Sequence, residues 1–241
     1  MLNIKKVPYF NFLKKLLILL LGVSPVYIFL SINVSKNISE NDLEVINKLN
    51  IKKSCQNTNS YQDELNCFKK IASAQRNLVK NVSCRGYFIE LGSTEFLQAN
   101  TGCCSDRARL MEQTLRHYGF KVRHVHLHVT DNIGFANLLI PRTRSHAVNE
   151  VLTSKGWLGI DSNEDFLLVD KDLNPLTYYR AIEEGIIKNY SKIDFYDEEL
   201  IYIIGLYSRH GTFFKPYLPG FPEFNFVDFF NNINKIKIFN I

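Results

Sequence analysis

Three short segments of the chain carry residue types that together predict one nucleophilic site. Cys104 follows a glycine and a second cysteine, His146 stands beside Ala147, and Asp161 comes four residues after Trp157. A thiol attacks a carbonyl carbon well only as the thiolate, so it needs a neighbouring base. The base in turn needs a third group that holds its ring in place. This combination predicts cysteine-dependent nucleophilic catalysis.

The segment 104–118 predicts the helix that would activate this cysteine. It consists of good helix formers without an internal glycine or proline, and its apolar residues recur at three- and four-residue spacings. Gly119 marks the expected end of the helix. Cys104 would then lie in the first turn, where the helix dipole favours an anion by roughly 0.3–1 kcal/mol. The competing interpretation is a small buried thiol that packs the start of a helix.

The histidine and the aspartate fall on segments that favour β-strands. Residues 121–130 alternate and are rich in β-branched side chains, and 145–153 and 157–161 follow as two further strands. The sequence Ser-Lys-Gly at 154–156 favours a tight turn between the last two. An antiparallel hairpin of this kind brings His146, near the start of one strand, close to Asp161, at the end of the next.

On these residues, the stretch 102–161 resembles the core of the transglutaminase-like superfamily. The resemblance rests on Gly102-x-Cys104, on the sequence His-Ala-Val-Asn-Glu at 146–150, and on Trp157 followed by Asp161. It covers about 60 of 241 residues. Val148 stands where the family usually has an aromatic residue, a departure that affects the expected wall of the acyl pocket. The sequence Cys-x-Asp-Arg-x-Arg at 104–109 also resembles a bacterial subgroup of membrane-tethered transglutaminase-like proteins.

The resemblance implies a papain-like α+β fold, with the nucleophile at a helix N-terminus packed on an antiparallel sheet. It makes Cys104, rather than Cys103, the nucleophile, His146 the general base and acid, and Asp161 the orienting carboxylate. The implied reaction is acyl transfer through a thioester on a protein or peptide amide, ending in cross-linking, deamidation or hydrolysis. It requires no metal and no cofactor. A papain-like thiol protease and a non-catalytic binding or assembly protein of the cell envelope are the alternatives.

A second set of chemically capable residues lies on the strand predicted at 121–130. His124, His126 and His128 alternate, so all three project from one face of that strand. Imidazoles in this arrangement can bind zinc. Val125, Leu127 and Val129 on the other face favour a structural interpretation, in which the valines and leucine enter the core and the histidines face water or a covering loop.

The N-terminus predicts a membrane anchor. Residues 1–15 form a basic segment with Lys5, Lys6, Lys14 and Lys15, and residues 16–34 form an apolar run that just reaches the length of a bilayer span. Lysines ahead of the run predict a cytoplasmic N-terminus and an extracytoplasmic catalytic domain, in the bacterial periplasm or at the cell surface. A cleaved signal peptide is the alternative.

Five cysteines fit an oxidising compartment if one of them stays free. Cys55 and Cys67 are the expected pair by proximity, which leaves Cys84 to pair with Cys103 and Cys104 unpaired. Free buried thiols are the alternative.

The remaining sequence favours one extracytoplasmic unit. Residues 35–60 are expected to be a linker and a first helix, over 42–49, and residues 61–241 a transglutaminase-like domain with a C-terminal extension. Helices are expected at 61–79 and 175–188, a helix or strand at 198–207, and a helix and then a strand over 226–241. The net charge of +5 is modest, and the sequence shows neither the concentrated basic face nor the recognisable module that nucleic-acid binding requires.

Overall fold

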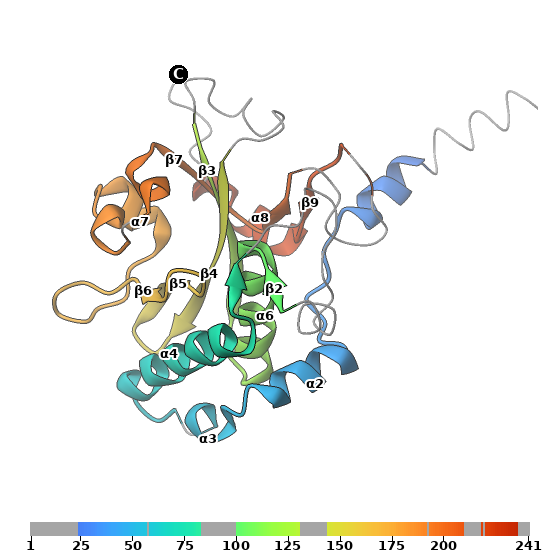
Figure 1. Ribbon diagram of the computed structural model, residues 1–241. Helices are drawn as coiled ribbons and strands as arrows, with labels where there is room; N and C mark the ends of the chain where they lie inside the picture. The colour runs from blue at the N-terminus through green and yellow to red at the C-terminus, as the bar shows by residue number, and fades with distance from the viewer. Residues whose placement is uncertain are drawn as a thin grey trace, which may run out of the picture.

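A five-stranded antiparallel sheet lies at the centre of the computed structural model, which describes residues 24–56, 58–82, 100–130, 144–191, 193–209, 218 and 220–235 (Figure 1). The strand order is β6-β5-β4-β3-β7. The strands are β3 (Val122–Val129), β4 (Ser145–Thr153), β5 (Gly156–Asp161), β6 (Phe166–Leu167) and β7 (Leu200–Ile204). The predicted hairpin is confirmed, because β4 and β5 pair antiparallel around the turn at 154–155.

Helices cover both faces of this sheet. On one face, α4 (Tyr61–Leu78) and α6 (Cys104–His117) enclose a core cluster that includes Met111, Leu115 and Val151. On the other face, α7 (Tyr178–Glu183) and the 3-10 helices η3 (Ile187–Asn189) and η4 (Asp194–Asp197) cover a second cluster. Figure 1 shows α7 and α6 on opposite sides of the sheet. The mixed helical and antiparallel arrangement is the expected α+β class.

The N-terminal half consists of helices with well-defined starts. Ser39 caps α2 (Glu40–Lys48), and Ser60 caps α4. Each serine side chain accepts the backbone N–H of the aspartate three residues on, and the serine backbone N–H donates to that aspartate's carboxylate. The short α3 (Lys52–Cys55) lies between them. Two-residue strands β1 (Asn81–Val82) and β2 (Thr101–Gly102) pair parallel just before α6.

The C-terminal half departs from the expected elements. The helix predicted at 175–188 is only α7, because Gly185, at φ 65°, ends it. The segment expected at 198–207 is a strand broken in two by Gly205, where a Cβ atom would lie 2.7 Å from the Phe229 backbone nitrogen. Beyond Gly205 follow β8 (Leu206–Ser208), β9 (Glu223–Phe224), α8 (Phe226–Asn231) and η5 (Ile233–Lys235).

The chain enters this domain through a helix over residues 24–31. Residues 32–34 then run beside β9: Val34 N–H donates to Phe224 O over 2.6 Å, and Phe224 N–H donates to Ile32 O over 2.8 Å. The end of the apolar run 16–34 therefore pairs with the domain. Residues 1–23, which carry most of the predicted anchor, lie outside the described residues. Within the described residues, no helix is both long enough and apolar enough to span a bilayer.

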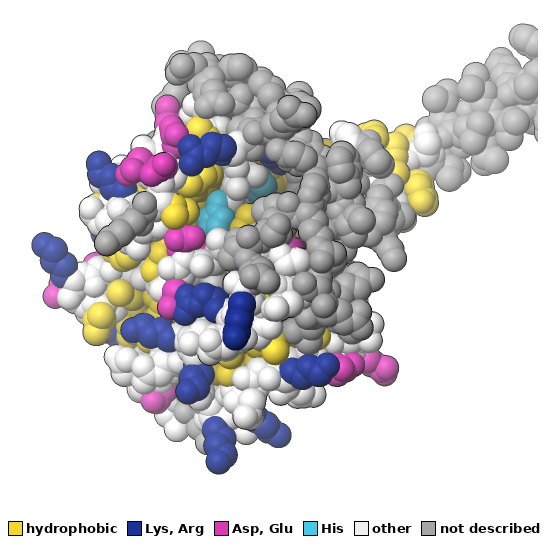
Figure 2. Space-filling view, in the orientation of Figure 1, with side chains coloured by type: hydrophobic (Ala, Val, Ile, Leu, Met, Phe, Trp, Pro, Cys, Tyr) yellow, Lys and Arg dark blue, Asp and Glu magenta, His cyan; other side chains and the backbone are white. Residues whose placement is uncertain are grey.

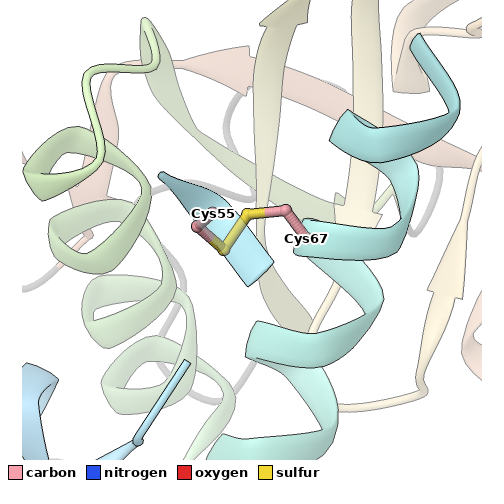
Figure 3. Close-up of a disulfide and its surroundings, with 2 residues drawn as sticks. All are labelled: Cys55 and Cys67. Atoms are coloured by element: carbon pink, nitrogen blue, oxygen red, sulfur yellow. A yellow bond between two sulfur atoms is a disulfide. The ribbon is translucent and has the colours of Figure 1, made fainter. Parts of the chain in front are cut away.

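The predicted disulfide between Cys55 and Cys67 is present and joins α3 to α4 (Figure 3). Its S–S distance is 2.08 Å, and both cysteines are buried. Cys103 is also disulfide-bonded, whereas its expected partner, Cys84, lies outside the described residues. Cys104 is a free thiol, as expected.

The buried carboxylate of Glu150 on β4 forms hydrogen bonds with β3, β7 and α7. Glu150 accepts hydrogen bonds from Arg123 Nε (2.7 Å) and Nη2 (2.5 Å) on β3, and from the Tyr202 hydroxyl (3.1 Å) on β7. Its other oxygen accepts the backbone N–H of Tyr178 over 2.7 Å, which fixes the start of α7. Because Glu150 is fully buried and satisfied, removing it leaves a buried guanidinium without its counter-charge.

Removing the Cys55–Cys67 bridge is expected to destabilise the domain. The bridge closes a loop with a sequence separation of 12 residues, and loops of this size lower the free energy of the folded state by about 2–3 kcal/mol relative to the unfolded chain. The double variant Cys55→Ala/Cys67→Ala should lose that amount in urea unfolding. Cys104→Ala, which removes an unbridged thiol, is the control. Equal midpoints for the double variant and the wild type would contradict this role.

Replacing Glu150 is expected to cost more than replacing an exposed glutamate in an ion pair. Glu150→Ala should lower the free energy of unfolding by about 3–5 kcal/mol, since Arg123 stays buried and unpaired. Glu184→Ala, which breaks the exposed pair with Arg180, should leave it almost unchanged, because solvent screens this pair. The two variants are compared by urea unfolding followed by circular dichroism. Similar losses for both would show that the buried network does not stabilise the sheet.

Candidate functional site

The structure brings the three predicted site residues together at one end of the sheet. His146 is the second residue of β4, Asp161 is the last residue of β5, and Cys104 is the first residue of α6. Three local features produce this arrangement: a helix start, a strand start and a strand end that meet at the same sheet edge. The antiparallel pairing of β4 with β5 places the histidine diagonally across from the aspartate.

His146 and Asp161 form a direct, buried pair. His146 Nε2 lies 2.7 Å from Asp161 Oδ2, and neither residue is appreciably exposed. Burial lowers the pKa of His146, but the charge and hydrogen bond of Asp161 and the neighbouring Cys104 raise it, and the net pKa lies well above its usual range. The imidazolium form is therefore favoured at this position.

Asp161 is held by β4, by η4 and by the turn that follows β5. Its Oδ1 accepts the backbone N–H groups of Asn163 (2.8 Å) and Glu164 (3.1 Å), and its Oδ2 accepts the Tyr196 hydroxyl over 2.6 Å as well as bonding His146. Burial raises the pKa of Asp161, but the charge of His146 and these hydrogen bonds lower it below its usual range. The carboxylate is therefore fixed in position and ionised.

Cys104 faces the other side of the imidazole. The Cys104 side chain lies within hydrogen-bonding reach of His146, and since His146 Nε2 is taken by Asp161, Nδ1 is the ring nitrogen left for the thiol. Cys104 is partly exposed, so a reagent can reach it. Its sulfur lies 4.0 Å from that of Cys103, but the two form no vicinal disulfide, because Cys104 is free.

A capping box sets the start of α6 and hence the position of Cys104. Cys103 is the N-cap, with extended backbone (φ −85°, ψ 173°), and its N–H donates to Asp106 Oδ2 over 2.7 Å. One turn further on, buried Arg107 donates to the carbonyl of Val79 over 2.7 Å. The first backbone N–H groups of a helix have no intrahelical acceptor, so that of Cys104 lies next to the thiol with no partner inside the helix.

Two aromatic residues beside His146 were not identified from sequence. The rings of Phe195 and Tyr196 lie 5.6 Å and 6.0 Å from the imidazole, both edge to face. Tyr196 also holds Asp161 from 35 positions away along the chain. The sequence near 195 has no spacing or motif that indicates this contact, because it arises only when η4 folds over the end of β5. Val148, expected at the wall of an acyl pocket, is instead a core residue beneath α7.

The three alternating histidines of β3 are buried, so of the two surroundings expected for them, water or a covering loop, water is excluded. His124 stacks on Tyr207 with ring centroids 4.2 Å apart, and His126 and His128 lie 6.0 Å apart. Burial is the main cause that lowers the pKa of His124 and of His128 to about 4 and that of His126 well below its usual range. All three are therefore neutral at pH 7. Among the described residues, no group of three or more His, Cys, Asp or Glu side chains is arranged to bind a metal.

Comparisons with known proteins bear on the same part of the chain. Residues 53–162 match the family model of the transglutaminase-like superfamily. No curated protein matches the chain. Among solved structures, the chain is similar to the crystal structure of Rad4-Rad23 bound to a 6-4 photoproduct UV lesion, with 12% identity and a TM-score of 0.35. That similarity covers 69% of this chain and 41% of the other, so the chain spans less than half of that protein.

The matched segment contains all three residues that meet at the end of the sheet, together with the disulfide and the central strands. The chain is therefore similar, over residues 53–162, to the transglutaminase-like superfamily, whose fold in general supports cysteine-dependent acyl transfer or hydrolysis.

Proposed function

We propose that the protein catalyses acyl transfer from an amide or peptide carbonyl through a thioester on Cys104. The contact sequence Cys104–His146–Asp161 is the observation that carries this proposal. It combines a reachable thiol at a helix start, a base beside it, and an ionised carboxylate that fixes the base. These are the three parts that nucleophilic catalysis by a thiol requires.

The thiol proton resides on His146 before the reaction begins, and in the first step the Cys104 thiolate attacks the carbonyl carbon of the substrate. A C–S bond forms, and the carbonyl π electrons move to the oxygen. The backbone N–H of Cys104 is one donor for that oxyanion. Collapse of the intermediate breaks the C–N bond, His146 returns its proton to the departing nitrogen, and a thioester with Cys104 remains.

In the second step, the acceptor attacks the thioester. His146 removes a proton from an amine or a water molecule, the new C–N or C–O bond forms, and the C–S bond breaks. His146 then returns the proton to Cys104. Throughout, Asp161 holds Nε2 and stabilises the imidazolium. An amine acceptor gives cross-linking, whereas water gives deamidation of a side-chain amide or hydrolysis of a peptide.

The proposal also places the domain outside the cytoplasm, on a membrane anchor formed by the apolar run that begins at residue 16. The N-terminal lysines and the length of the run support a single span with a cytoplasmic N-terminus. The buried Cys55–Cys67 bridge supports an oxidising compartment. The substrate would then be a protein or peptide amide of the bacterial cell envelope.

An activated thiolate should be detectable by alkylation of the full chain in detergent. Because His146 lies beside the thiol, iodoacetamide should label Cys104 rapidly at pH 7. Replacing His146 by Ala should slow this labelling at pH 7 by about tenfold or more. His117→Ala, on the exposed last turn of the same helix, is the matched control. Equal labelling rates in the wild type and His146→Ala would contradict an activated cysteine.

Turnover should depend on the same three residues and reveal the acceptor. Glutamine-containing peptides are offered with a biotinylated amine, and biotin incorporation, ammonia release and peptide cleavage are followed in parallel. Cys104→Ala should abolish all three signals, and Asp161→Asn should reduce the active one by about 10²–10⁴-fold. Cleavage alone would identify a papain-like protease. Activity that persists in Cys104→Ala would contradict the mechanism. A wild-type protein that is neither alkylated at Cys104 nor active on any peptide would favour a binding or assembly protein.

Tyr196 should act as a positioning residue for Asp161. Its hydroxyl lowers the pKa of Asp161, so Tyr196→Phe raises that pKa, and the acid limb of kcat/KM should move to higher pH. Losing a hydrogen bond to a buried charge should also reduce kcat by about tenfold. Tyr190→Phe, which removes a hydroxyl bonded to the Val169 carbonyl, is the control. A lower kcat with an unmoved pH profile would indicate a general structural effect instead.

A further inference from the structure

Large apolar side chains are exposed on two neighbouring helices that the catalytic site does not use. The helix over 24–31 exposes Val26, Tyr27, Phe29 and Leu30, and Figure 2 shows hydrophobic side chains gathered where this helix projects from the domain. The α8–η5 segment exposes Val227 (68%), Phe230 (57%) and Ile233 (47%). The last three recur every three residues, so they share one side of the segment. These seven residues are called the apolar face below.

The two parts of the apolar face are joined. Phe29 stacks on Phe226 with ring centroids 4.2 Å apart and planes 7° from parallel, and Phe226 in turn stacks against Phe230 at 5.9 Å. Asn33 pairs with Phe224 just beyond the first helix. Lys36 forms an ion pair with Asp228 of α8. The apolar face is therefore continuous and attached to the domain at the point where the chain enters it.

A strongly cationic pocket adjoins this face on the other side of α8. Its volume is about 560 Å³, and Asp228, Asn231 and Asn232 of the α8 region form part of its wall. Trp157, the single tryptophan of the chain, lies in the pocket beneath Arg123, whose guanidinium carbon is 4.2 Å from the ring centroid. The charged lining comprises one carboxylate, from Asp228, and five cations: Lys36, Arg116, Lys121, Arg123 and Lys235.

Most of this positive charge is not neutralised by the protein. Lys36 pairs with Asp228, and Arg123 pairs with buried Glu150. Arg116, Lys121 and Lys235 form no ion pair with any described residue. Burial and the charge of Arg123 lower the pKa of Lys235, and the buried Nε of Arg116 has no hydrogen-bond partner. An anion in this pocket would relieve that repulsion and accept the unused donors.

An anionic bilayer fits the two features together better than a soluble anion does. Phosphate alone would match the pocket but leave the apolar face in water. Aromatic and aliphatic side chains favour the boundary between headgroups and acyl chains, and basic residues beside them attract anionic lipid. The helix over 24–31, which carries part of the apolar face, directly follows residues 1–23 in the sequence. Those residues comprise the basic segment and the first part of the apolar run.

We propose that the apolar face and the cationic pocket together form a docking surface for an anionic membrane, with α8 lying at the bilayer surface and a lipid phosphate in the pocket. The proposal rests on the proposed membrane anchor, whose run includes the exposed residues of the helix over 24–31, and it goes beyond that anchor because it fixes the orientation of the domain. Arg123 lies four residues before Leu127, the β3 residue that pairs with His146, and Trp157 lies four residues before Asp161 on β5. Four residues correspond to roughly 13 Å along a strand. Docking at the pocket end therefore turns Cys104 away from the bilayer.

The orientation is tested with the full chain in phosphatidylcholine vesicles containing brominated lipid, with or without phosphatidylglycerol. Phe230→Trp places a fluorophore on the apolar face, and Tyr179→Trp places one on α7 as a matched control. Wild-type Trp157 emission is the baseline. In vesicles with phosphatidylglycerol, the emission added by Phe230→Trp should be lost to quenching, whereas that added by Tyr179→Trp should remain. Flotation of the vesicles reports anchoring separately, so the two properties can fail independently.

The contribution of charge is tested in the same assay. Lys121→Gln/Lys235→Gln should remove the dependence on phosphatidylglycerol, as should high salt, whereas Lys69→Gln/Lys70→Gln on exposed positions of α4 should not. Equal quenching at positions 230 and 179, or none at 230, would overturn the proposal. So would a shift of Trp157 emission with inorganic phosphate but not with anionic vesicles.

Discussion

The buried Glu150 carboxylate is the interaction on which the arrangement of the sheet depends. It receives Arg123 from β3, Tyr202 from β7 and the first backbone N–H of α7. His146 lies four residues earlier on the same strand, so it projects from the same face. The network that fixes the register of β4 with its neighbours therefore also fixes where the imidazole stands. The stability of the sheet and the geometry of the candidate site are coupled through one strand, because a shift of one residue would turn His146 to the opposite face.

The parts of the site that follow from local chemistry could be predicted from the sequence. Gly119 and the spacing of Leu110, Met111 and Leu115 indicated the helix that begins at Cys104, and the turn at 154–156 indicated the hairpin that carries His146 and Asp161. Each of these signals lies within one element or one tight connection. The proximity of Cys55 and Cys67 was likewise enough to predict their disulfide, since the loop between them is short.

What could not be predicted depends on contacts between distant parts of the chain. Tyr196 reaches Asp161 only because η4 folds over the end of β5. The burial of the β3 histidines depends on the chain beyond Gly205, which places Tyr207 against His124. Periodicity alone assigns the apolar side of a strand to the core and leaves the other side to water. It does not indicate that β3 is covered on both sides, which requires knowing that β8 and α6 pack there.

The antiparallel sheet gives the domain two chemically different ends. Where β4 begins and β5 ends, a thiol, an imidazole and a carboxylate meet, with opposite charges paired in a largely buried site. Where β3 and β5 begin, like charges gather around Trp157, and Arg116, Lys121 and Lys235 lack counter-charges among the described residues. The charges of the first site compensate one another, whereas a cluster of uncompensated cations is more stable with an anion beside it. Since the strands between the two ends are rigid, whatever binds the cationic end determines the direction in which Cys104 faces.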